Sequence, residues 1–151
     1  MSHTTKIKKV AITDIPALYA AVAELQQAGV NCEMVQNSKA RMYSQGQTDS
    51  LGICDHVLKL HNSPYDIGFT KEPDGSYVPA FDEWGGHVAG TGVGAACPVP
   101  SSAEGKMQHA IGKLMQGYGK HAAINQARRE GYTVESASYN KKNELVLEIA
   151  V

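Results

Sequence analysis

Apolar residues in the first part of the chain follow a strand-like period and then a helical one. Residues 6–12 predict a first strand, although the alternation is imperfect. Asp14 is placed to cap a following helix, and Pro16 falls in the first turn, where a missing N–H costs nothing. We expect Gly29 to end this helix and its apolar stripe to face the core: Ile15, Leu18, Val22 and Leu25.

The middle of the chain predicts strands that lie close together in sequence. Residues 30–36 and 51–60 indicate two strands separated by a polar segment. Residues 66–70 and 76–81 predict a hairpin that turns at Pro73-Asp74-Gly75. Neighbouring strands joined this way favour an antiparallel meander.

The last third predicts one long helix and a closing hairpin. Ser101-Ser102-Ala103-Glu104 matches a capping box, and the helix is expected to run to about Glu130, ended by Gly131. Gly112, Gly117 and Gly119 weaken this helix, and either a kink or a close packing contact is predicted near Gly117–Gly119. Residues 132–139 and 144–151 then alternate as a C-terminal hairpin. Tyr118 is expected to pack in the core, and His121 to form a local hydrogen bond.

The predicted order is β-α-β-β-β-β-α-β-β in one domain over residues 1–151. Two helices on one face of a mainly antiparallel sheet, an α+β fold that is ferredoxin-like in outline, would satisfy this order. Residues 85–100 interrupt it, because this segment is rich in glycine and contains no charged residue. A loop of this length is uncommon within a domain and is usually functional or flexible. A flexible surface loop, which could order against a partner or a sister subunit, is the favoured interpretation.

Composition narrows the class of protein. The 151 residues are 42% hydrophobic and 19% charged, which is typical of a globular domain. The net charge of −1 argues against a dedicated nucleic-acid-binding or membrane-surface protein, although it allows a local basic patch. No long apolar run or signal peptide is evident, and the three cysteines are an odd number without framework spacing. We therefore expect a cytoplasmic protein that does not enter the membrane.

Motifs that would carry catalysis or cofactor binding are weak. Cys54 and His56 point to one face of a strand and, with His61, form the only metal-like group close in sequence; a metal-dependent enzyme at Cys54 and His56 is one alternative. The glycine-rich segment matches neither phosphate-binding loop pattern. No nucleophile motif is recognisable. The prediction is a non-enzymatic protein without a cofactor.

The second helix carries cations at heptad spacing. Lys106, Lys113 and Lys120 recur every seven residues, with His109 on the same side, and no acidic residue lies between Glu104 and Glu130. Such a stripe predicts an anion-binding face, for an acidic protein or for nucleic acid. An ordinary solvated helix face is the simpler alternative. The candidate partner-binding residues are this stripe and two residues at the start of the loop: Lys106, His109, Lys113, Lys120, Trp84 and His87.

Several short motifs resemble one family. Residues 65–69, 74–77 and 82–84, the helix segment from Leu114 to His121, and the segment from Ala127 to Val134 resemble the uncharacterised chloroplast-frame family ycf thirty-five, the domain of unknown function 1257. Its members occur in plastids, cyanobacteria and bacteriophages, and it carries no established activity. In phages such genes often lie near an AAA-type ATPase, which the resemblance implies as a partner. The uncharged loop and the closing Glu-Ile-Ala-Val depart from the family and favour a divergent viral or bacterial member.

These observations favour a small adaptor that binds another protein. A nucleic-acid-binding protein that uses the same basic stripe is the first alternative, and the metal-dependent enzyme is the second. The edges of the closing hairpin also leave pairing between subunits open, so that a homo-oligomer is a further option.

Overall fold

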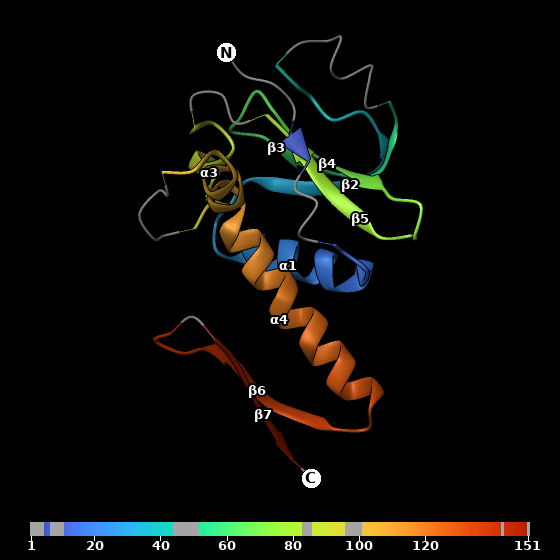
Figure 1. The fold of residues 1–151 in the computed structure, drawn as a ribbon, viewed down its shortest axis with the longest axis vertical. Coiled ribbons are helices and arrows are strands. Elements are labelled where there is room, and N and C mark those ends of the chain that lie inside the picture. The colour runs from blue at the N-terminus through green and yellow to red at the C-terminus, as the bar shows by residue number, and fades with distance from the viewer. Residues whose placement is uncertain are drawn as a thin grey trace.

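The structure is a computed structural model that describes residues 5–6, 11–43, 52–82, 86–95, 101–142 and 144–150. Five strands form an antiparallel sheet in the order β1-β5-β4-β3-β2, and β6 and β7 form a second sheet of two strands. The helices α1 and α4 lie between the two sheets (Figure 1). The predicted α+β class with a mainly antiparallel sheet is confirmed, whereas the ferredoxin-like outline is not, because the closing hairpin does not join the main sheet.

The main sheet is built around the predicted meander. Its strands are β1 (Thr5–Lys6), β2 (Cys32–Ser38), β3 (Cys54–Leu60), β4 (Ile67–Lys71) and β5 (Tyr77–Phe81). The hairpin of β4 and β5 forms as predicted, with Gly75 at a positive φ of 88° in its turn. Of the predicted first strand, the structure describes β1 and a single bridge from Ile12 to Tyr77, both along the β5 edge.

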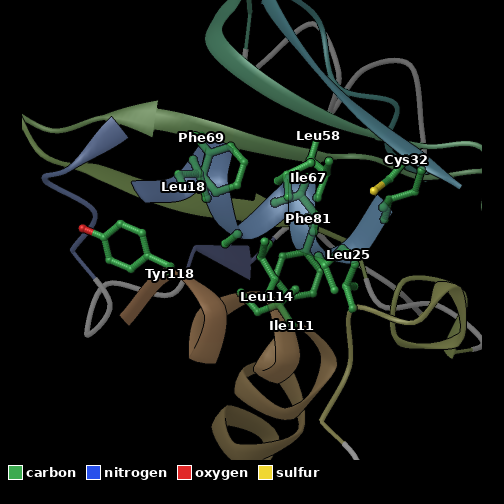
Figure 2. Close-up of a cluster of buried hydrophobic side chains, with 14 of the residues drawn as sticks. Leu18, Leu25, Cys32, Leu58, Ile67, Phe69, Phe81, Ile111, Leu114 and Tyr118 are labelled. Atoms are coloured by element: carbon green, nitrogen blue, oxygen red, sulfur yellow. The ribbon is translucent and has the colours of Figure 1, made fainter. Parts of the chain in front are cut away.

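The helix α1 (Ile15–Gln27) forms where its pattern predicts, and covers one face of the sheet. The Asp14 carboxylate accepts a hydrogen bond from Ala17 N at 3.1 Å, and Gly29 has a φ of 98° just beyond the helix end. Its buried stripe packs with sheet residues such as Phe69 and Leu58 and with the first turn of α4 at Leu114 (Figure 2). Two helices on one face of the sheet are therefore confirmed.

The predicted long helix is divided into α3 (Ala103–Ala110) and α4 (Gly112–Arg129), and the prediction of one continuous helix is wrong. The break lies at Ile111, which has a φ of −121° and is fully buried. Backbone from the glycine-rich segment supplies the physical reason. The carbonyl of Val93 accepts hydrogen bonds from Lys113 N and Leu114 N, and Ala95 N donates to the carbonyl of His109. These bonds replace helical ones across the break.

The capping prediction needs a correction of one residue. Ser102, rather than Ser101, is the N-cap of α3, and its hydroxyl accepts a hydrogen bond from Gly105 N at 3.0 Å. At the other end, Gly131 follows the last turn of α4 with a φ of 92°, as predicted.

Residues 86–95 are not the flexible surface loop that composition predicts. They contain the short 3-10 helix η2 (Ala89–Thr91), and both Val88 and Val93 are fully buried in the main core. The segment lacks charge because part of it is core, where an unpaired charge would be costly. The remaining residues of the predicted loop lie outside the described part of the chain.

Asp66 organises the turn that leads into β4. Its carboxylate is fully buried and accepts hydrogen bonds from the backbone of Arg41 and Leu60, from the Arg41 guanidinium, and from Lys59 Nζ at 3.2 Å. Burial by itself raises the pKa of Asp66, but the hydrogen bonds from Arg41 and Leu60 and the charge of Lys59 outweigh burial and hold the pKa below its ordinary value.

Replacing this carboxylate tests its contribution. We expect Asp66→Asn to lower the free energy of unfolding by about 2–4 kcal/mol at neutral pH, because buried donors lose a charged acceptor. A carboxyl group with a lowered folded-state pKa stabilises the protein above its unfolded pKa of about 3.9 and loses that effect as the pH falls through the folded value. Urea denaturation should therefore show wild-type stability falling in acid more steeply than that of the variant. Parallel pH profiles would contradict this role.

Replacing Gly112, at the start of α4, and Gly119, in its middle, by alanine should change the stability of the protein in opposite directions. A Cβ on Gly112 would lie 2.6 Å from Ala95 Cβ, whereas a Cβ on Gly119 would meet only the Tyr139 hydroxyl at an ordinary 3.5 Å. We expect Gly112→Ala to destabilise the protein by about 1–3 kcal/mol through overpacking. Gly119→Ala should stabilise it by up to about 1 kcal/mol through helix propensity. Thermal and urea denaturation measure both, and equal effects would show that the break in the helix is not tightly packed.

Candidate functional site

The candidate site is formed where α4 crosses α1. A Cβ on Gly117 would lie 3.2 Å from the Cβ of Ala21, so the two helices are in close contact at these small residues. The predicted close packing at Gly117 is thus confirmed, and α4 passes through Gly117 and Gly119 without a break. This contact brings polar side chains of both helices together on either side of it.

Tyr118 fixes α4 to the start of α1. Its side chain is buried, as predicted, and its hydroxyl accepts hydrogen bonds from Thr13 N at 3.0 Å and Asp14 N at 3.2 Å (Figure 2 labels the residue). Two turns further along α4, Asn125 donates to Asp14 Oδ2 at 3.1 Å. Asp14, the N-cap of α1, therefore accepts hydrogen bonds both from its own helix and from α4.

On the other side of the crossing, Glu24 of α1 bridges two cations of α4. Lys120 Nζ lies 2.8 and 2.9 Å from the two carboxylate oxygens, and His121 Nε2 lies 2.8 Å from Oε1. Partial burial by itself raises the pKa of Glu24, but hydrogen bonds from Lys120 and His121 outweigh it and hold the pKa below its ordinary value. The hydrogen bond of His121 joins two helices and is not the local one that the sequence predicts.

Beside this ion pair lies a groove between α1, α4 and β6 (Thr133–Tyr139). Its volume is about 300 Å³, which is at the lower end of the range of ligand pockets. Small side chains on α1 and α4 leave the space, and β6 closes one side of it. The groove is lined by Ala21, Glu24, Leu25, Ala28, Lys113, Gln116, Gly117, Lys120, Ala137, Ser138 and Tyr139.

Tyr139 holds β6 against α4 at this groove. Its hydroxyl donates a hydrogen bond to the carbonyl of Gln116, and burial raises the pKa of Tyr139. The phenol must be protonated to donate this hydrogen bond, and the raised pKa extends the bond toward more alkaline pH. The hairpin wall of the groove is therefore tied to the helix by a hydrogen bond at its turn end.

The structure divides the predicted basic stripe. Lys106 is exposed on α3 and His109 is half-buried there, whereas Lys113 and Lys120 lie on α4 beyond the break at Ile111. The break explains the division, because heptad spacing aligns side chains only along one continuous helix. Lys113 and Lys120 are brought together as lining residues of the groove, and Lys120 is paired with Glu24.

The loop candidate His87 is not among the residues that line this groove. The ring of His87 is exposed and stands edge-on to the ring of Tyr65, with 5.8 Å between centroids. Tyr65, its ring partner, does not line the groove either. Trp84 lies outside the residues that the structure describes.

The structure gives the three predicted metal-ligating residues different partners. Cys54 is buried in a small cluster with Ala40 on the opposite face of the sheet from α1, while His56 Nδ1 lies 2.9 Å from the Tyr19 hydroxyl. His61 Nε2 lies 3.3 Å from Glu33. Within the described part of the chain, no three or more His, Cys, Asp or Glu residues are grouped so that they could hold a metal ion.

Sequence analysis missed the residues that complete the groove. Glu24 lies on the polar side of an amphipathic helix, where a carboxylate carries no sign of a partner about a hundred residues away. Tyr139 ends an alternating strand and has no motif of its own. Gly117 was the one usable signal, because a glycine inside a helix often marks a close approach.

Comparison with known proteins assigns the chain to a family. The model of a family described as "protein of unknown function (DUF1257)" matches residues 21–147. The chain belongs to this family, as the resemblance predicted. The match covers the second half of α1, all of α4 and most of the hairpin. No curated protein and no solved structure matches the chain. In the described ranges, no helix is both long enough and apolar enough to cross a membrane.

Removing one hydroxyl tests how α4 is fixed to α1. We expect Tyr118→Phe to lower the free energy of unfolding by about 1–2 kcal/mol, because Thr13 N and Asp14 N lose their acceptor. In a chain of this size that change lowers Tm by roughly 2–4 °C per kcal/mol. Tyr132→Phe is the matched control, since Tyr132 is 42% exposed. Equal Tm values for the two variants would show that the hydroxyl is replaceable by water.

Proposed function

We propose that this domain is a non-enzymatic protein-binding module that takes up a segment of another protein in the groove between α1, α4 and β6. The observation that carries this proposal is the groove itself, an apolar depression of about 300 Å³ with lysines among its lining residues. A groove of this kind suits a short partner segment in which apolar side chains insert and an acidic one remains near the surface.

The lining chemistry supports uptake of side chains. Ala21, Ala28, Gly117 and Ala137 supply a floor of small residues, and Leu25 adds a larger apolar contact. Small residues leave room for the larger side chains of a partner, and burial of apolar surface is the main favourable term in association. We therefore expect one or two aliphatic or aromatic anchors in the bound segment.

The positive charge of the groove favours a partner segment that contains an acidic residue. Lys113 is exposed at the groove, and within the described residues it forms no ion pair. Lys120 shares the groove, but its charge is offset by Glu24 at 2.8 Å. Lys113 therefore presents most of the uncompensated charge of the groove, and a carboxylate in the partner would complement it.

The same lining favours binding over nucleophilic catalysis. Neither histidine nor cysteine is among the residues that line the groove. Ser138 therefore has no imidazole base beside it within that lining. An AAA-type ATPase, which the family resemblance implies as a partner, remains one candidate source of the segment.

Selection from a random peptide library tests the proposal. We expect wild-type protein to enrich peptides that combine an acidic residue with apolar anchors. Lys113→Glu should weaken the binding of an enriched peptide roughly tenfold, the effect of losing about 1.4 kcal/mol. Glu24→Gln should strengthen it a few-fold, because Lys120 then becomes available. Fluorescence anisotropy with labelled peptide measures all three dissociation constants.

Lys71→Glu is the matched control, because it makes the same charge change at an exposed position at the end of β4, outside the lining residues. Its dissociation constant should equal that of the wild type. Loss of binding in Lys71→Glu as well would point to net charge alone. Tight binding to an oligonucleotide, with a steep salt dependence and no enriched peptide, would replace this proposal with the nucleic-acid alternative.

A further inference from the structure

The closing hairpin exposes apolar side chains on its outer strand. It consists of β6 and β7 (Leu145–Ala150), and none of its described residues is buried. Ile149 is 39% exposed, and Val146, on the opposite face, is 43% exposed. The strand register places six apolar or aromatic side chains on one face: Val134, Ala137, Tyr139, Leu145, Leu147 and Ile149.

The hairpin packs on α4 mainly through β6, whereas β7 is its outer strand. Two-stranded sheets are at best marginally stable in water, and at least three strands, or packing against a helix, are needed. Tyr139 holds the turn end to α4 and β6 begins close to the end of α4, whereas β7 is the outer strand, away from the main sheet (Figure 1). The apolar face toward Ile149 is therefore left with little cover from the described residues.

The outer edge of β7 is open to pairing. The second sheet contains β6 and β7 alone, so this edge has no neighbouring strand among the described residues. Proteins usually protect such an edge with lysine, proline or a bulge. The sequence of β7, Leu-Val-Leu-Glu-Ile-Ala, contains neither lysine nor proline, and the single irregularity of the ladder lies in β6 between Val134 and Ser136.

We propose that two copies of this chain associate by antiparallel pairing of β7 with β7, with Leu147 of one copy opposite Leu147 of the other. This inference is independent of the groove proposal, because no residue of β7 lines the groove. The association joins the two hairpins into one sheet of four strands with a continuous apolar face. Four strands also add support to a hairpin that otherwise packs only on α4 through β6.

The charge pattern of the strand disfavours the two neighbouring registers, and a centre at Leu147 pairs the whole run from Glu144 to Ala150 with a second copy. Directly opposed residues of antiparallel strands point to the same face, so the centre of a symmetric pairing is a residue that faces itself. If Glu148 lies at the centre, the two copies of Glu148 face each other. If Val146 lies at the centre, Glu148 of each copy faces Glu144 of the other. If Leu147 lies at the centre, Glu148 of each copy faces Val146 of the other, and Leu145 faces Ile149. Only uncharged residues then face the glutamates, and apolar residues face each other.

The size of the contact sets the expected affinity. A stable interface of standard size buries about 800 Å² on each partner, and one six-residue strand edge offers less than that. We therefore expect a reversible dimer with a dissociation constant on the order of micromolar to tens of micromolar. Sedimentation velocity over a concentration series spanning this range measures it.

Cysteine cross-linking tests the register. Directly opposed residues have Cα atoms about 4.5–5.5 Å apart, within the range of a disulfide. In a Cys97→Ser background, Leu147→Cys should form a covalent dimer under mild oxidation. Leu145→Cys is the matched control, because in this register its two copies lie about 13 Å apart, four residues along the strand. Cys32 and Cys54 are buried and should not contribute.

A pair of charge variants provides a second test that does not depend on oxidation. Val146 points to the solvent face and is opposed by Glu148 of the second copy in the proposed register. Val146→Lys should therefore dimerise roughly tenfold more tightly than Val146→Glu, since two opposed pairs change from like to unlike charge. A monomer at every concentration, equal affinities for the two variants, or equal cross-linking at positions 145 and 147 would each overturn the proposal.

Discussion

The close contact of α1 with α4 is the interaction on which the candidate surface depends. Ala21 and Gly117 allow the helices to meet at their backbones, and hydrogen bonds on either side then fix their relative position. The Tyr118 hydroxyl accepts backbone hydrogen bonds from the residues just before α1. Further along α1, the Glu24 carboxylate pairs with Lys120 and His121 of α4. The small residues that permit the contact also leave the adjoining space open. Tight packing and the groove are therefore consequences of the same choice of side chains.

The rest of the molecule holds this helix pair in place from the sheet side. The buried carboxylate of Asp66 collects donors from Arg41, Lys59 and Leu60 and thereby fixes the connection between β3 and β4. The glycine-rich segment serves a comparable purpose at the other end, because the carbonyl of Val93 receives the first backbone donors of α4. The start of α4 is thus set by a segment that itself packs in the core.

The groove and the hairpin edge fit one organisation of the domain. The groove presents lysine beside small apolar residues and faces β6, whereas the outer edge of β7 lies away from it. A second copy bound at that edge would leave both grooves accessible. A dimer of this kind would offer two identical grooves, and bivalent engagement raises apparent affinity without any new contact. Weak individual contacts would then suffice for stable binding.

Local chemistry determined several helix ends and turns, and the sequence alone was sufficient to predict those. The cap at Asp14, the glycine after each long helix and the turn at Gly75 depend on neighbours a few residues away, so their signals are local. The division of the second helix at Ile111, the burial of Val88 and Val93, and the separate sheet of the hairpin were decided by the tertiary structure. Each depends on backbone or side-chain partners that are distant in sequence. The groove is the clearest case, because Glu24, Lys113 and Tyr139 come from three elements and meet only after α4 has packed on α1.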